Sequence, residues 1–476
     1  MREGLTYNDV LLVPKYSDVE SRKQLSTQTR LSSRITLNAP LISANMDTVT
    51  EAKMATRMAE LGGIGIIHRF LTIEQQVAQV ARVKRSHNFL IHDPYTISEK
   101  ATLAEVRQQI VHRGVNSFLV VNEAGLLAGM LTPRDLLFED DPDVSVSDLM
   151  TPYERLVVKT VESGAQINYE DARSLLRQHR LEKLPLVYQD RKIAGLITSK
   201  DIHKRMEYPL AVKDSQGRLL VGAAVGVKND YLERAAELVK AGVDALVIDI
   251  AHGHSKFLLE TLSDLKEHYP QIDIIAGNVA TEAATRDLIQ AGADAIKVGV
   301  GPGSTCSTRI VTGSGVPQLT AVFDACREAQ KHNIPVIADG GVRTSGDIVK
   351  ALAAGAASVM LGGMLAGCEE SPGLTRIKDG QKVKILRGMA SFDAAMNRQS
   401  SEAGYSVDLD SYVPEGIETI SPYKGQVSEI IAQLMGGIRS GMSYLGARTI
   451  SEMEAQAEFI RMSGAGWNES IPHAKG

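Results

Sequence analysis

Residues 219–251 read LLVGAAVGVKNDYLERAAELVKAGVDALVIDIA, and this stretch decides the fold class. An apolar run is followed by an amphipathic stretch through ERAAELVKAG, and a second apolar run, DALVIDIA, comes directly after it. Short apolar runs joined by helical stretches predict parallel strands with helical crossovers. The sequence therefore predicts an α/β protein built on a parallel sheet.

The same alternation continues on both sides of this stretch. The downstream runs are IDIIAGNVA, ADAIKVGVGPGS, IPVIADGG and ASVMLGGML, and the upstream runs are PLISANMDTV and GGIGIIHR. Eight such runs predict a closed (β/α)8 barrel of the TIM type, whose chemistry lies at the carboxyl ends of the strands. The alternative is an open doubly wound sheet, but no G-x-G-x-x-G opens a helix after the first strand.

A segment from about residue 91 to residue 207 interrupts this pattern and contains an internal repeat. GMLTPRDLL at 129–137 and GLITSKDIH at 195–203 share the pattern G-apolar-apolar-T-x-[RK]-D. Two small strand–helix units that cannot bury their faces alone predict a paired module. We therefore expect a catalytic barrel formed by residues 1–90 and 208–476, with residues 91–207 inserted as a regulatory module.

The repeat resembles a tandem pair of cystathionine β-synthase-type (CBS) domains. In that family the T-x-x-D element binds an adenine nucleotide, and the resemblance implies an adenine or guanine nucleotide site at Thr132, Asp135, Thr198 and Asp201. A threonine or aspartate ahead of a helix also caps the helix without any ligand. Both interpretations stay open for each of the four residues.

Composition points to a small ligand. The chain has 476 residues, which is enough for two or three domains, and its formal net charge is −5. This charge gives no indication of binding to nucleic acid or to anionic lipid. No apolar run of transmembrane length and no signal-peptide-like stretch is found, so we expect a cytoplasmic protein that contacts no membrane.

The three cysteines, Cys306, Cys326 and Cys368, do not have the number or spacing of a disulfide framework or a zinc site. Cys326 lies in a helix-like stretch, AVFDACREAQ, which suits a buried structural residue. Cys306 lies in GVGPGSTCSTR, where glycines allow close backbone approach to an anion or a carbonyl. A thiol in such a loop can have a lowered pKa, so Cys306 is the candidate nucleophile.

The cysteine loop is one of several motifs that point the same way. GVGPGSTCSTR, VIADGGVRTSGDIVKALAAGA and MLGGMLAGCEESPG, with LTYNDVLLVP and ISANMDTVTE, resemble the IMP dehydrogenase / GMP reductase family over nearly the whole chain. The resemblance implies that Cys306 attacks the purine C2 position and that a hydride passes between C2 and a nicotinamide. A covalent adduct of this kind divides one difficult exchange into two easier steps. Thr308 matches the threonine that helps to activate the departing or attacking group.

The binding residues are implied by the same resemblance. Asp339 matches the carboxylate that accepts both ribose hydroxyls, and phosphate ligands are matched at glycine-rich strand ends, where turn chemistry alone is the alternative. Asp249 and Asn278 match the dinucleotide side. The residues that match substrate contacts are Ser43, Met46, Ser304, Asp339, Gly341, Gly362, Gly363 and Glu415.

The C-terminal segment GAGWNESIPH resembles one that donates carbonyls to a potassium ion in a neighbouring dehydrogenase subunit. The resemblance implies a monovalent cation site formed by Gly301, Gly303 and Cys306 together with Glu469 and Ser470. The family usually forms homotetramers, and CBS pairs can join these into octamers.

The expected flap, about residues 390–418, separates the two activities of the family. The dehydrogenases have Ser-Ser-Asp-Arg-Tyr where this chain reads SSEAGY at 400–405, so the arginine that activates water is missing. The reductases use instead the threonine and an acidic residue soon after a Gly-Met pair, and Asp393 stands near that position. GGIRSGMSYLGA near the C-terminus also leans toward the reductase.

Other features lean toward the dehydrogenase. VPEGIE, with Glu415 as the purine contact, is dehydrogenase-like, and the CBS pair is more usual among dehydrogenases. Arg398 could replace the missing arginine if the flap repositions it. Leu386 stands where the dehydrogenases usually have a phosphate-binding tyrosine, which leaves the phosphate contacts of the last strand open.

Taken together, the missing catalytic arginine favours a GMP reductase, which converts GMP and NADPH to IMP and ammonia. An IMP dehydrogenase, which converts IMP, NAD and water to XMP, is the alternative. A nucleotide-sensing protein with an inactive barrel is a third hypothesis, and the intact Cys306, Thr308 and Asp339 argue against it.

Overall fold

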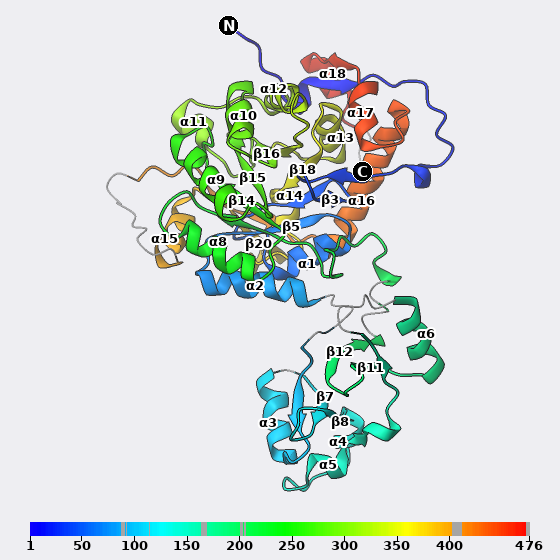
Figure 1. The fold of residues 1–476 in the computed structure, drawn as a ribbon. Helices are drawn as coiled ribbons and strands as arrows, with labels where there is room; N and C mark the ends of the chain where they lie inside the picture. The colour runs from blue at the N-terminus through cyan, green and yellow to red at the C-terminus, as the bar shows by residue number, and fades with distance from the viewer. Residues whose placement is uncertain are drawn as a thin grey trace. The chain divides into compact units, whose positions relative to one another are not determined.

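The computed structural model describes residues 1–86, 91, 93–113, 115–162, 169–199, 203, 206–401 and 412–472 (Figure 1). Contacts divide the chain into two compact units. Unit 1 comprises Met1–Ser86 and Leu210–Gly476, and unit 2 comprises His87–Pro209. Among the residues described, no helix has the length and apolar character needed to cross a membrane.

Unit 1 is built around a closed barrel of eight parallel strands, which confirms the predicted (β/α)8 fold. All residues of β5, β13, β16 and β18 are buried, because the barrel interior covers one face of each strand and helices cover the other. In their order around the barrel, the strands are β4 (Leu41–Ser43), β5 (Ile64–Ile67), β13 (Gly222–Val225), β14 (Ala245–Asp249), β15 (Asp273–Val279), β16 (Ala295–Val298), β17 (Val336–Asp339) and β18 (Ser358–Leu361).

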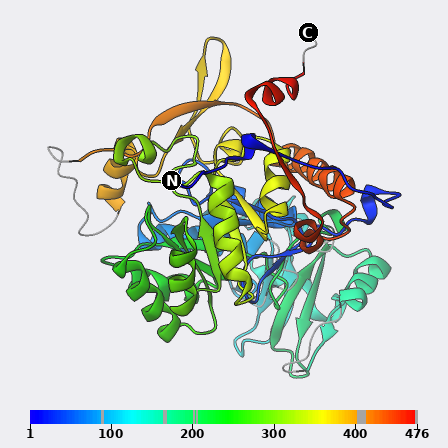
Figure 2. The same cartoon turned by 90° about the horizontal axis from the view of Figure 1, so that it is seen from above.

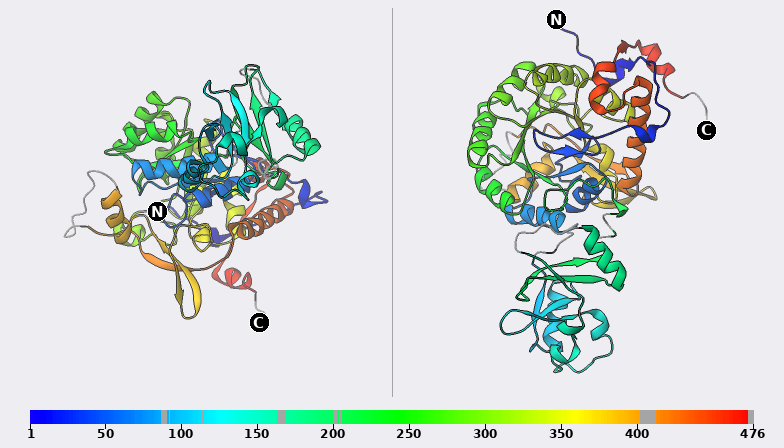
Figure 3. Two further views of the ribbon diagram at one scale, coloured as in Figure 1. Left: turned by 90° about the horizontal axis from the view of Figure 1, so that it is seen from below. Right: turned by 45° about the vertical axis from the view of Figure 1, so that its right-hand side comes forward.

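Helices form a ring outside these strands, as the right-hand view of Figure 3 shows. The last of them, α16, packs against both α13 and α1, so the ring closes as the strands do. The helices of the ring are α1 (Ala52–Glu60), α2 (Ile73–Ser86), α8 (Tyr231–Lys240), α9 (Lys256–His268), α10 (Glu282–Gln290), α12 (Gln318–Gln330), α13 (Ser345–Ala353) and α16 (Val427–Leu445).

Further elements decorate the barrel. An antiparallel sheet of β19, β20 and β21 follows the last barrel strand, and its β19–β20 hairpin projects outward in Figure 2. Near the termini β1 pairs with β22, and β2 pairs with β3. These elements are η1 (Tyr7–Asp9), β1 (Val10–Leu12), η2 (Arg22–Gln24), β2 (Thr29–Arg30), β3 (Thr36–Leu37), α11 (Thr308–Thr312), α14 (Gly363–Ala366), β19 (Thr375–Lys378), β20 (Gln381–Arg387), α15 (Phe392–Ser401), β21 (Glu418–Pro422), α17 (Ile450–Gln456), β22 (Phe459–Arg461) and α18 (Gly464–Glu469).

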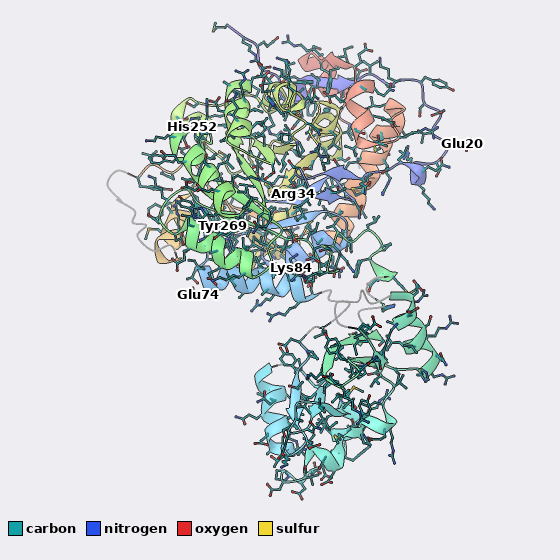
Figure 4. The ribbon with its side chains drawn as sticks, viewed as in Figure 1. Glu20, Arg34, Glu74, Lys84, His252 and Tyr269 are labelled. Carbon is teal, nitrogen blue, oxygen red and sulfur yellow. The ribbon has the colours of Figure 1, made fainter. Side chains whose placement is uncertain are left out.

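A buried ion-pair cluster joins the two chain segments that form unit 1. Lys84, labelled in Figure 4, lies in the last turn of α2 and its side chain is 4% exposed. Its ammonium donates to Asp214 at 3.1 Å and to Asp244 at 2.6 Å. Burial raises the pKa of Asp244, although Lys84 opposes that rise. Because α2 precedes unit 2 and Asp214 follows it, Lys84 joins the two chain segments of the barrel.

Unit 2 consists of two halves with the same strand arrangement. In each half a parallel pair (β6 with β7, β10 with β11) is followed by an antiparallel pair with one register irregularity (β7 with β8, β11 with β12). The elements are β6 (Thr96–Ser98), α3 (Leu103–Arg113), β7 (Phe118–Val121), β8 (Leu127–Leu131), α4 (Pro133–Leu136), α5 (Val146–Leu149), β9 (Thr151–Pro152), η3 (Tyr153–Arg155), β10 (Lys159–Thr160), α6 (Tyr169–His179), β11 (Lys183–Val187) and β12 (Ile193–Thr198).

The two halves of unit 2 share an apolar core. Leu119 and Leu127 of the first half cluster with Val187 and Leu196 of the second, and all four are buried. This core explains why the sequence repeat occurs twice, since neither half encloses these side chains alone.

Candidate active site

The cysteine loop lies at the carboxyl end of β16, where a barrel places its chemistry. Cys306 is half-buried, and its Sγ lies 3.1 Å from the Oγ1 of Thr308, the first residue of α11. A turn closed by the Cys306 N–H and the Gly303 carbonyl at 3.1 Å shapes the loop ahead of the thiol. The structure therefore brings the predicted nucleophile within hydrogen-bond distance of the predicted activating threonine.

A chain segment from the far end of the flap lies against this loop. Cys306 forms an antiparallel bridge with Gly416, and the Ser307 N–H donates to the Glu415 carbonyl at 2.9 Å. On the other side of the bridge, the Ile417 N–H donates to the Thr305 carbonyl at 2.9 Å. The backbone of Glu415 is thus fixed beside the thiol, although its family match concerned the side chain.

Arg309 closes the loop from behind. Its Nε donates to the Val300 carbonyl at 3.1 Å and its Nη2 donates to the Val316 carbonyl at 2.5 Å. Burial lowers the pKa of Arg309, while Cys306 acts in the opposite direction. The sequence reading missed this residue, because a loop arginine carries no signal that distinguishes a backbone clamp from a solvated charge.

Four predicted phosphate or nucleotide contacts lie together at the ends of β16, β18 and β4. A Cβ on Gly363 would lie 2.7 Å from Ser304 Oγ, and a Cβ on Gly362 would lie 2.9 Å from Met46 Sδ. Glycine at both positions keeps this approach open. The first of these Cβ atoms would also lie 3.5 Å from Leu386, so that side chain occupies the same corner.

The base of the flap is fixed by a charge pair that no motif indicated. Arg387, the last residue of β20, donates through Nε and Nη2 to Asp47 Oδ2 at 2.7 and 2.6 Å. Its backbone N–H donates to Thr48 Oγ1 at 3.3 Å. Since Asp47 and Thr48 follow β4, these bonds join the flap to the loop that carries Met46.

A charged cluster occupies the carboxyl ends of β14 to β17. The predicted ribose ligand Asp339 and the predicted dinucleotide residues Asp249 and Asn278 all surround Lys297 of β16. Lys297 Nζ donates to Asp339 Oδ2 at 2.9 Å and to Asn278 Oδ1, and it lies 3.9 Å from Asp249 Oδ1. Burial disfavours the charged amine, but the carboxylates of Asp339 and Asp249 outweigh it and raise the pKa of Lys297.

Lys297 was missed at the level of sequence, although a signal was present. It is the one charged residue in the apolar strand AIKV, and its side chain is 3% exposed. A charge inside a buried strand needs buried partners, so it pointed toward the barrel interior.

The remaining predicted substrate residues are placed less directly. Ser43 is fully buried, and its Oγ receives a hydrogen bond from Thr50 Oγ1 at 2.9 Å. A Cβ on Gly341 would lie 3.3 Å from Gln318, whose amide also donates to the Asp339 carbonyl at 3.1 Å. Gln318 therefore holds the turn after β17 and is a further residue that no motif singled out.

Comparison with known proteins decides the family. The family model described as IMP dehydrogenase / GMP reductase domain matches residues 4–473. The chain belongs to this family. It is therefore an NAD(P)-dependent oxidoreductase of purine metabolism.

Both activities of the family occur among similar proteins. An inosine-5'-monophosphate dehydrogenase of Nitrosopumilus maritimus is 52% identical over 99% of this chain and 98% of its own. A GMP reductase of Leishmania donovani is 50% identical over 99% of this chain and 97% of its own. A crystal structure of a cysteine-to-alanine variant of Trypanosoma brucei GMP reductase with guanosine 5'-monophosphate has a TM-score of 0.93 and 48% identity, covering 100% of this chain and 99% of that one.

The two flap residues singled out for the family chemistry, Asp393 and Arg398, both lie on α15. Asp393 lies exposed in the first turn of α15 and has no side-chain hydrogen bond or ion pair within the described part of the chain. Arg398, on the same helix, has its guanidinium 5.9 Å from the ring centroid of Phe70, after β5. The flap letters 402–405, on which the missing arginine depends, lie outside the described residues.

The candidate cation ligands divide into two groups. Gly301, Gly303 and Cys306 share the cysteine loop, whereas Ser470 donates from Oγ to the Gly466 carbonyl at 2.9 Å, and Glu469 ends the same helix, α18. Among the described residues no cluster of three or more His, Cys, Asp or Glu side chains could hold a metal.

The two other cysteines are structural in this family member. Cys326 on α12 is 2% exposed and Cys368 is 0% exposed. Burial raises the pKa of Cys368 to about 12 and raises the pKa of Cys326 further. The prediction that Cys326 is a buried residue is confirmed.

The T-x-x-D elements of unit 2 differ in what can be described. Asp135 Oδ2 accepts hydrogen bonds from both the backbone N–H and the hydroxyl of Thr132, each at 2.7 Å. This is a capping box at the start of α4. Thr198 ends β12, and Asp201 lies outside the described residues.

Proposed function

We propose that the protein is a GMP reductase, which reduces GMP with NADPH to IMP and releases ammonia. The observation that carries this proposal is the flap sequence SSEAGY, in which no arginine stands where the family's dehydrogenases activate water. The contact between Arg398 and Phe70 supports the proposal, because it engages the guanidinium that would otherwise replace the missing water-activating arginine.

The inserted unit no longer argues against a reductase. A GMP reductase from Leishmania donovani matches 99% of this chain over 97% of its own length. The matched region includes the inserted unit, so a protein with that name also carries it. The choice between the two activities therefore depends on the catalytic residues and not on the inserted unit.

The residues of the cysteine loop supply the chemistry in this proposal. The thiolate of Cys306 adds to purine C2, and the 2-amino group leaves as ammonia after it has gained a proton. Thr308, 3.1 Å from the sulfur, is placed to relay a proton between the thiol and the leaving group. Asp393 is proposed to assist, which requires the flap helix to close over the loop.

The binding residues divide between the nucleotide and the nicotinamide cofactor. Asp339 holds the ribose and Glu415 contacts the base. Ser43 and Met46 lie near the nucleotide, and the phosphate is held by Ser304, Gly341, Gly362 and Gly363. Asp249 and Asn278 lie beside Asp339 and provide the polar groups that a dinucleotide needs at this edge. NADPH bound there would supply a hydride to C2, and Cys306 would then leave as the thiolate, so that the nucleophile is regenerated.

The near-ultraviolet absorbance of NADPH tests this proposal directly. We expect purified protein with GMP and NADPH to lose absorbance and release one ammonia per NADPH consumed. We expect no change in absorbance when the protein is mixed with IMP, NAD and potassium. A rise in absorbance in the second mixture alone would assign the dehydrogenase activity instead.

The dehydrogenase remains the second candidate because of one observation. The first three curated relatives are all inosine-5'-monophosphate dehydrogenases, at 50–52% identity. In that case a residue other than the missing arginine activates water, and Arg398→Ala would abolish XMP formation while leaving reduction of the cofactor in the first turnover intact.

We further propose that unit 2 is a nucleotide-binding CBS pair and that the enzyme is a homotetramer or an octamer, in which α18 of one subunit completes a potassium site on the cysteine loop of another. Adenine and guanine nucleotides should then raise the thermal stability of the protein, and Asp135→Ala should weaken this effect. A thermal shift unchanged by both ATP and GTP would contradict the nucleotide site.

A further inference from the structure

The charged cluster at the barrel mouth is centred on a residue that no motif indicated. We propose that Lys297 is a positioning residue, which orients Asp339 for the ribose of the nucleotide and couples it to the dinucleotide side of the site. The inference rests on the proposed function in one respect, because it takes Asp339 as the ribose ligand.

The strands around Lys297 leave room for its side chain. Lys297 on β16 is paired with Gly277 on β15, and Gly277 is paired with Asp249 on β14. A Cβ on Gly277 would lie 2.4 Å from the carbonyl oxygen of Lys297 and 2.7 Å from its Cβ. Any side chain at Gly277 would therefore displace the lysine from the row that it forms with Asp249.

Asp339 has one oxygen committed to the protein and one available. Its Oδ2 accepts hydrogen bonds from Lys297 Nζ and from Asn278 Nδ2, both at 2.9 Å. Its Oδ1 accepts none within the described part of the chain, and the side chain is 21% exposed. Because a carboxylate offers about four lone-pair sites, Oδ1 is left with two sites for the two hydroxyls of a vicinal diol.

Asn278 extends the same network across the site. It receives a hydrogen bond from Lys297 on its amide oxygen, and its amide nitrogen donates to Asp339 and to the Gly299 carbonyl at 2.8 Å. The amide orientation is therefore fixed from both ends. A change at Lys297 would be felt at Asp339 and at Asn278 together.

The two carboxylates differ in how much they depend on the lysine. Lys297 is the only cation that forms an ion pair with Asp339 in the described ranges, whereas Asp249 also lies 3.9 Å from Arg69, after β5. Without Lys297, Asp339 would face Asp249 without a counter-ion of its own. The repulsion between the two carboxylates would then turn Asp339 away from the orientation in which its Oδ1 can accept both hydroxyls.

The test replaces Lys297 by methionine, which keeps an unbranched side chain of similar length and removes the charge. We expect the KM for GMP in Lys297→Met to rise about tenfold or more at neutral pH, the scale of a lost charge-assisted hydrogen bond. We also expect kcat at saturating GMP to change much less than KM, because Lys297 orients a binding group and does not touch the reacting atoms.

Two further variants separate a positioning role from a merely structural one. Lys297→Arg retains the charge, and the KM for GMP should recover toward the wild-type value with it. The double variant Lys297→Met/Asp249→Asn removes the competing negative charge, so GMP binding measured without cofactor should recover in part. A structural role predicts instead that the second substitution adds a further loss.

Lys84→Met is the matched control, since it removes a lysine of equal burial from the same barrel. It should lower thermal stability and leave the KM for GMP unchanged. An unchanged KM in Lys297→Met would overturn the proposal, and if that variant does not fold, the same result in Lys297→Gln would do so.

A failure of the proposed function is distinguishable from a failure of this inference. If the wild type turns over IMP and NAD in place of GMP and NADPH, the same variants are measured with IMP. GMP and IMP carry the same ribose, so the expected rise in KM is the same. Only a normal KM for the nucleotide that is actually used contradicts the role of Lys297.

Discussion

Two buried lysines of the barrel are alike in exposure and differ in what surrounds them. Lys84 pairs with Asp214, whose Oδ1 accepts two backbone N–H groups, and with Asp244, which lies at the amino end of β14, away from the carboxyl ends of the strands. Lys297 pairs with Asp339, whose Oδ1 is left without a protein donor among the described residues. Burial alone therefore does not separate structure from function. An acceptor left open at the carboxyl ends of the strands does.

The largest expected effect tests whether chemistry lies on the cysteine loop and not on either lysine cluster. Cys306→Ala should reduce turnover by on the order of 10⁴-fold or more, because no other group can form the adduct at C2. GMP binding, measured by calorimetry, should be nearly unchanged, since the binding cluster is intact. Substantial turnover in this variant would contradict covalent catalysis.

Lys84→Met should give the largest change in stability. Asp214 keeps its ion pair with Arg218, but Asp244 is left without a cation among the described residues, so we expect the free energy of unfolding to fall by about 3 kcal/mol. Urea denaturation followed by circular dichroism measures this. If kcat or KM changed instead, with stability unaltered, the distinction between the two lysines would be wrong.

Thr308→Val should lower kcat by roughly 10- to 100-fold, the lower range for a positioned proton-transfer group, with little change in KM. Thr308→Ser keeps the hydroxyl and is the control. Stopped-flow measurement of ammonia release and NADPH oxidation should place the defect in the step that expels ammonia. Equal activity of the valine and serine variants would remove the hydroxyl from the mechanism.

The smallest effect concerns the two buried thiols. Burial raises the pKa of Cys368 to about 12 and that of Cys326 as well, so both remain protonated near pH 8.5 and should resist iodoacetamide while Cys306 reacts. Because their folded-state pKa values lie above the unfolded value of about 8.5, their contribution to stability is complete below that pH and decreases above it. Peptide mapping checks the alkylation, and modification of all three cysteines in the folded protein would contradict it.

Much of the fold could be predicted from the sequence because its signals are local. The eight apolar runs became the eight barrel strands, since each carries its own hydrophobic pattern and is followed by a helix. The cysteine loop was found for the same reason, because Cys306 and Thr308 are two residues apart.

The rest of the site depends on contacts that cross the barrel. Lys297 meets Asp339 over 42 residues of sequence, and Arg387 meets Asp47 over 340. No periodicity or spacing reports such pairs, because closure of the barrel creates them. The match of Asp393 to a catalytic acid stays a prediction, since one residue type near a motif does not determine where a flap places it.

The central claim is that Cys306 displaces ammonia from C2 of GMP, and mass spectrometry of a trapped adduct tests it most directly. The protein is incubated with GMP and NADP⁺, which cannot donate hydride, and then quenched in acid. We expect a mass increase equal to GMP minus ammonia on the peptide that contains Cys306, with ammonia released and no adduct in Cys306→Ala. No adduct from GMP, together with one that forms from IMP and NAD, would contradict the reductase and identify the dehydrogenase.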